Sequence, residues 1–229
     1  MLILQNIIES KYHYQPSWLL LIIVFGVMIL GYLYSAFNTR FNTFVKAVFL
    51  SRFSVQASRE ERSLSHPFSL LLSLNFILIT SLFVLQVITS EVFFHTDVDF
   101  SLLSFLLVVL FIAGIYFVKI IFLRIFSFIL DKQETISEYL FIIFLLSQFL
   151  GIVLLPVVIC TAYGPAPLAH ACVYLGMLLL FSAFLVRVGK GISMVMLGRQ
   201  ATLFYLILYL CTLEILPLLI GIKLFERLV

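Results

Sequence analysis

Glu214 is the residue of this sequence best suited to chemistry, because it is an acid placed well inside a long apolar segment. A carboxylate in hydrocarbon is costly, so it needs a hydrogen-bond partner, a proton or a function. Pro217 follows three residues later and clashes with the carbonyl of Leu213, so we expect the helix to loosen beside the acid. Such an acid can carry a proton or contact a substrate. The alternative is a structural acid that is protonated or hydrogen-bonded across helices.

Polar side chains that could act together with Glu214 are few, and most lie on other apolar segments. At 1.5 Å per residue, Glu214 lies about 20 Å along a helix that begins at Ala201, which is past the middle of a bilayer. The candidates for this intramembrane polar site are Tyr209 and Thr212 on the same segment, and Gln86, Gln148, His170 and Tyr174 on three others.

A second unusual stretch covers residues 148–156 and contains Gly151 and Pro156. A glycine inside a helix lets another backbone approach, and a proline removes one helical hydrogen bond. One interpretation is a cavity or hinge between the fourth and sixth apolar segments. The other is ordinary packing, because Gly and Pro are common in membrane helices and neighbouring helices satisfy the freed carbonyls.

The sequence has no arrangement typical of an enzyme, a metal site or a cofactor site. There is no H-E-x-x-H motif and no recognisable Ser–His–Asp or paired-carboxylate set. Residues 189–191, Gly-Lys-Gly, lack the spacing of a phosphate-binding loop. We therefore expect no enzymatic activity, no cofactor, no metal and no nucleic-acid partner.

The three cysteines form neither a C-x-x-C pair nor a Cys/His cluster, so no disulfide framework or zinc site is predicted. Cys160 and Cys172 are both expected near one membrane face. The sequence is compatible with two buried free thiols and with a disulfide bridge between them.

The elements that must position these residues are membrane-spanning helices. The chain is 63% hydrophobic and 11% charged, whereas a soluble domain has roughly 25% charged residues. A helix needs about 20 apolar residues to cross the hydrocarbon core. We predict an all-α transmembrane bundle in one membrane domain, with six spans at residues 18–35, 68–90, 100–121, 139–162, 168–186 and 201–222.

An amphipathic helix is predicted after the first span, at residues 40–54. Its apolar residues recur with the helical period, and Arg40, Lys46 and Arg52 flank that face. The helix could lie in the membrane surface, or its apolar face could pack on the protein's own spans. The cations expected to meet lipid headgroups are Arg40, Lys46, Arg52, Arg187 and Lys190.

The distribution of Lys and Arg predicts the orientation. The connections after the first, third and fifth spans carry eleven of the fourteen Lys and Arg residues. Because basic loops stay in the cytoplasm, these three connections are expected there and both termini on the periplasmic side.

Two motifs together resemble a known family. One is the run Tyr-Leu-Cys-Thr-Leu-Glu-Ile-Leu-Pro at residues 209–217, followed by Lys223, and the other is Ser-His-Pro-Phe at residues 65–68. With Gly151 and the Leu-Pro pair at 155–156, they resemble the domain of unknown function family 4271 of the Bacteroidetes. The resemblance implies a multi-pass protein of the bacterial inner membrane and implies no reaction, cofactor or catalytic residue.

The leading functional hypothesis is a non-enzymatic accessory or scaffold subunit of a cell-envelope complex. Its partners would be membrane lipids and other inner-membrane subunits, because the chain has short loops and few ionisable groups inside its spans. The alternative is a small transporter, or a proton- or lipid-handling protein, that uses Glu214 in a cavity between spans four and six. An intramembrane enzyme is a third reading that no nucleophile–base pair supports.

Overall fold

The computed structural model describes residues 16–49, 67–90, 100–129 and 133–197, and the regular secondary structure within them is entirely α-helical. The prediction of an all-α chain is therefore confirmed for these residues. The helices are α2 (Ser17–Ala36), α3 (Asn38–Phe49), α5 (Pro67–Thr89), α6 (Leu102–Ile129), α7 (Gln133–Tyr163) and α8 (Ala166–Leu197).

Four of these helices are long and apolar enough to cross a membrane: Ser17–Ala36, Pro67–Thr89, and the parts Ile143–Tyr163 of α7 and Pro167–Gly189 of α8. They correspond to the first, second, fourth and fifth predicted spans. The third corresponds to α6, whose apolar stretch Leu102–Val118 is shorter. The sixth predicted span, residues 201–222, lies outside the described residues.

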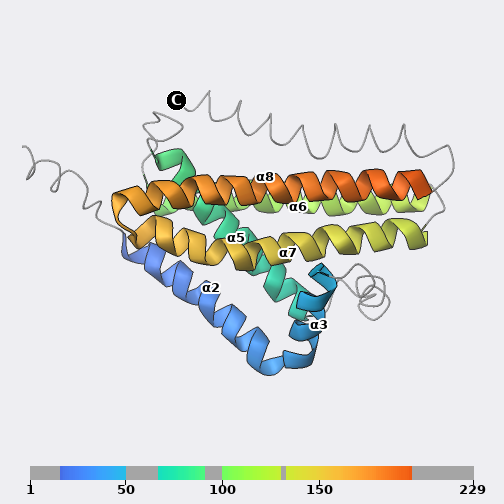
Figure 1. The fold of residues 1–229 in the computed structure, drawn as a ribbon, viewed down its shortest axis with the longest axis horizontal. Helices are drawn as coiled ribbons and strands as arrows, with labels where there is room; N and C mark the ends of the chain where they lie inside the picture. Colours follow the sequence, from blue (N-terminus) through green and yellow to red (C-terminus); the bar gives the residue numbers. More distant parts are fainter. Residues whose placement is uncertain (1–15, 50–66, 91–99, 130–132, 198–229) are drawn as a thin grey trace, which may run out of the picture.

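Helices α5 and α7 form the centre of the bundle. Just over half of the apolar window is buried in α5 (56%) and in α7 (61%), against 17% in α8 and 28% in α2. Figure 1 shows α5 crossing diagonally behind α7, while α6, α7 and α8 run nearly parallel to one another. The peripheral helices α2, α6 and α8 consequently keep one broad apolar face exposed.

The main core lies where α2, α5, α6, α7 and α8 meet. Its fully buried members include Leu19 of α2, Phe83 of α5, Leu154 of α7 and Val173 of α8. Trp18 stacks on Phe100 with ring centroids 5.3 Å apart. This stacking fixes the start of α2 against the chain that leads into α6.

Small residues allow the central helices to approach closely. A Cβ atom on Gly151 of α7 would lie 2.7 Å from the Cα atom of Phe76 in α5, so only glycine fits there. Pro156 does not interrupt α7, which continues to Tyr163, and its side chain is exposed. The predicted close approach at Gly151 is thus present, and its partner is the second span.

Helix α3 corresponds to the amphipathic helix predicted at residues 40–54, of which Arg52 lies outside the described residues. Its Phe44 is 5% exposed and packs in a cluster with Leu33, Phe68 and Leu145 from three spans. The apolar face of α3 therefore packs on the protein's own spans, while Arg40 and Lys46 are exposed.

Helices α6, α7 and α8 are longer than the apolar segments that predict them. The predicted fifth span ends at residue 186, but α8 continues to Leu197. Hydropathy marks the first charged residue as the end of a span, whereas a helix ends only when its backbone hydrogen bonding ends. The residues after Arg187 contain no proline before Leu197 that would stop it.

Candidate functional site

The buried polar side chains of the described bundle belong to its two central helices. Asn75, Thr80, Ser81 and Gln86 lie on α5, and Ser147 and Gln148 lie on α7. Large apolar residues such as Leu21, Leu110 and Leu178 are exposed on α2, α6 and α8 instead. Polar groups inside and apolar groups outside are the arrangement expected of a protein that lies in lipid.

Gln148 makes the densest set of side-chain hydrogen bonds between helices. Its Nε2 atom lies 3.0 Å from the carbonyl oxygen of Ser69, 2.9 Å from Ser69 Oγ and 3.0 Å from Ser73 Oγ. An amide nitrogen has two hydrogens, so it can donate to two of these three acceptors at a time. Gln148 thereby joins α7 to the first two turns of α5.

Tyr116 brings α6 to the same level of the bundle. Its hydroxyl lies 3.5 Å from Ser73 Oγ, which is long for a hydrogen bond. Its ring packs edge-on against Phe144 of α7, with centroids 5.0 Å apart. Tyr116 therefore closes the space between α5, α6 and α7.

Arg187 is the charged member of this group and comes from α8. Its Nη2 atom donates to Ser147 Oγ at 2.7 Å, and Ser147 Oγ donates to the carbonyl oxygen of Ile143 at 2.8 Å. Its Nε atom is buried and has no hydrogen-bond partner. The guanidinium also lies within electrostatic range of the Tyr116 hydroxyl.

We call the set that contains these residues the polar layer, because its members lie at one level of the bundle on four helices. It consists of Ser69, Ser73, Tyr116, Ser147, Gln148 and Arg187. Its one cation and its neutral hydroxyl and amide groups can bind an anion, and they offer no carboxylate to act as a base.

A second group of buried polar residues on α5 lies outside the polar layer and is poorly satisfied. Gln86 Nε2 donates to the carbonyl oxygen of Val158 at 3.3 Å, but its Oε1 atom has no partner. Asn75 is fully buried and neither of its amide atoms has a partner. A Cβ atom on Gly26 of α2 would lie 3.1 Å from Asn75 Oδ1, so α2 packs directly over this amide.

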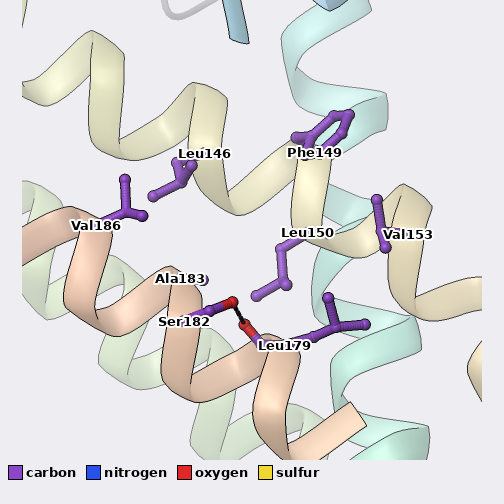
Figure 2. Close-up of a pocket in the computed structure, with 8 residues that line it drawn as sticks. All are labelled: Leu146, Phe149, Leu150, Val153, Leu179, Ser182, Ala183 and Val186. Atoms are coloured by element: carbon purple, nitrogen blue, oxygen red, sulfur yellow. Dashed lines mark hydrogen bonds between the residues drawn. The ribbon is translucent and has the colours of Figure 1, made fainter. Parts of the chain in front are cut away.

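A partly open groove runs between α7 and α8, next to the polar layer. It has a volume of about 140 Å³, and Figure 2 shows its walls on the two facing helices. Seven of its eight lining residues are apolar, and the hydroxyl of Ser182 donates to the carbonyl of Leu179 on its own helix at 2.9 Å. The lining is Leu146, Phe149, Leu150, Val153, Leu179, Ser182, Ala183 and Val186.

The residues predicted for the intramembrane polar site are only partly described. Glu214, Tyr209, Thr212 and Pro217 lie outside the described residues, so their arrangement stays a prediction. The side chain of Lys190, on α8, is also outside the described part.

The predicted partners that the structure describes are not gathered together. Gln148 meets Ser73 and Gln86 meets Val158, and thirteen residues, or about 20 Å of helix, separate Ser73 from Gln86 on α5. His170 and Tyr174 are exposed on α8.

Sequence reasoning missed Asn75 and most of the polar layer. Ser69 and Ser73 are four residues apart on an otherwise apolar span, which puts them on one helical face. Asn75 is an amide inside the same span, where polar groups are costly. These two signals could have identified α5 as a helix that carries buried polar groups.

The two cysteines expected near one membrane face are neighbours. Cys160 of α7 and Cys172 of α8 are free, and their side chains are close enough to interact. They lie on either side of the turn at Gly164. The described residues contain no group of three His, Cys, Asp or Glu that could hold a metal ion.

Comparison with protein families finds that the model of Domain of unknown function (DUF4271) matches residues 3–225. Comparisons with curated proteins and with solved structures find no match.

Proposed function

The chain belongs to the DUF4271 family, and because four of its helices are long and apolar enough to cross a membrane, we propose that it is a non-enzymatic scaffold or accessory subunit of a bacterial cell-envelope complex. The protein would be located in the inner membrane, and its partners would be other membrane subunits. The observation that supports this proposal is the length of three parallel helices.

Helices α6, α7 and α8 contain 28, 31 and 32 residues. At 1.5 Å per residue they are about 42, 46 and 48 Å long, whereas the hydrocarbon core is about 30 Å thick. Figure 1 shows that the end of α6, the start of α7 and the end of α8 lie at the same end of the bundle. Helices that run close to the membrane normal would project about 12–18 Å beyond the hydrocarbon at this end.

The projecting ends carry charged residues of both signs, which would favour a charged partner. Lys119 and Arg124 lie in the second half of α6, Glu134 and Glu138 in the first turns of α7, and Lys190 near the end of α8. The contact of Arg187 with Ser147 and that of Tyr116 with Phe144 would hold α8 and α6 against α7, and so keep these ends together. A rigid charged surface is suited to recognising one partner rather than to chemistry.

The proposed orientation puts this surface in the cytoplasm, since the basic connections include those that join or follow these helices. Both termini would then be periplasmic. Cysteine labelling of residues 38–65 by a membrane-impermeant reagent tests this, and labelling of that connection from the periplasm would reverse the orientation.

The scaffold function is tested by photocrosslinking in living cells. A photoreactive amino acid at Met194, in the last turns of α8, is expected to give one discrete protein adduct. The matched control is Leu178, which is 68% exposed on the same helix within the apolar stretch and should give lipid adducts alone. A clean monomer in mild detergent, with no protein adduct at Met194, would contradict the proposal.

A further inference from the structure

Arg187 carries a positive charge that the described residues do not balance. Helices α5, α6 and α8 contain no Asp or Glu, and α7 has only Glu134 and Glu138. Glu138 is nine residues before Ser147, or about 14 Å along the helix axis. The Nε atom of Arg187 is buried without a partner and Nη2 donates to Ser147 Oγ. The guanidinium therefore has its charge and its Nη1 donor left for an anion.

The depth of Arg187 matches that of a lipid headgroup. Arg187 is 21 residues after Ala166, the first residue of α8. This distance is about 32 Å, close to the hydrocarbon thickness of about 30 Å. If α8 enters the hydrocarbon near Ala166, Arg187 therefore leaves it at the level of the opposite phosphates.

The groove between α7 and α8 begins where the polar layer ends. Leu146 and Val186, which line the groove, are the chain neighbours of Ser147 and Arg187. In Figure 2 Leu146 and Val186 lie together at one end of the groove, and Leu179 and Val153 lie toward the other. The cation at the headgroup level matches the phosphate of a phospholipid, and the apolar groove beside it matches an acyl chain.

We propose that this site binds one anionic phospholipid. The phosphodiester accepts hydrogen bonds from the Arg187 guanidinium, whose planar fork suits phosphate oxygens. The Ser147 hydroxyl, already bonded to Arg187, holds the guanidinium in place. One acyl chain lies in the groove between Leu146 and Leu179 and covers its apolar lining.

Native mass spectrometry of the full chain tests this proposal. The delipidated protein is titrated with phosphatidylglycerol and, separately, with phosphatidylethanolamine. The wild-type chain is expected to retain one phosphatidylglycerol at least tenfold more strongly than phosphatidylethanolamine. Arg187→Gln should abolish this preference, whereas Lys132→Gln, which removes the same charge from the connection between α6 and α7, should leave it unchanged.

A groove variant keeps the test decisive if Arg187→Gln does not fold. Ser182→Phe changes an exposed position, keeps the charge of Arg187 and fills the groove. It should weaken phosphatidylglycerol retention at least tenfold. Unchanged retention in this variant, or equal retention of both lipids by the wild-type chain, would overturn the proposal.

The charge of Arg187 could instead be balanced within the chain by Glu214, which lies outside the described residues. In that case Arg187→Glu would lose its fold and the double variant Arg187→Glu/Glu214→Arg would regain it. Such a rescue would also overturn the lipid site. Failure of the rescue together with phosphatidylglycerol preference supports it.

Discussion

Gly151 of α7 lies directly against the backbone of Phe76 in α5, so that a Cβ atom at position 151 would be 2.7 Å from Phe76 Cα. The two helices in contact here are the most buried of the described bundle. Backbone atoms cannot move aside as a flexible side chain can, so this contact sets the distance between the central helices.

Replacing Gly151 by alanine should force α5 and α7 apart. We expect Gly151→Ala to destabilise the protein by about 1–3 kcal/mol, the usual cost of overpacking a core. Gly114→Ala is the control, because a Cβ atom there meets nothing within 4 Å. Thermal unfolding in detergent, followed by circular dichroism, measures both. Equal midpoints for the two variants would mean that the close contact is absent.

Removing the amide of Gln148 should weaken the link between α7 and α5. Hydrogen bonds between membrane helices are worth about 1 kcal/mol, so Gln148→Leu should lower the free energy of unfolding by about this amount. Gln86→Leu should cost less, since Gln86 makes one bond of 3.3 Å and leaves its Oε1 atom unpaired. A larger loss for Gln86→Leu than for Gln148→Leu would contradict the assigned bonds.

Asn75 is expected to lower the stability of the folded protein, because its buried amide makes no hydrogen bond in the structure. A buried polar group without a partner costs about 1–3 kcal/mol, so Asn75→Leu, similar in size, should raise the unfolding midpoint. Ser81→Ala is the control, because Ser81 is also fully buried but donates to the Ile77 carbonyl at 2.7 Å. If Asn75→Leu is less stable than the wild-type chain, then the Asn75 amide has a partner in the membrane, such as a water molecule or a ligand.

The neighbouring thiols of Cys160 and Cys172 should form a disulfide under mild oxidation. Side chains that already lie close together need little movement to reach the separation that a disulfide requires. Oxidation in isolated membranes should remove both thiols from maleimide labelling. In the Cys160→Ser variant Cys172 should stay labelled, and a Cys172 that resists oxidation in the wild-type chain would refute this prediction.

The sequence alone determined the class of this protein, most of its helices and its family. Hydropathy is a property of contiguous residues, so five of the six predicted spans coincide with described helices without any knowledge of their packing. The run at residues 209–217 indicated the family in the same way, although Glu214 lies outside the described residues and its role stays a prediction.

Only the tertiary structure decided which polar groups meet. Gln148 and Ser69 are 79 residues apart in the chain, and Arg187 and Ser147 are 40 apart. Helices α5 and α7 have almost no preferred apolar face, so periodicity could not indicate how they are rotated. Close approach at Gly151 and the order of the helices fix that rotation, and with it the polar layer that holds Arg187 beside the groove.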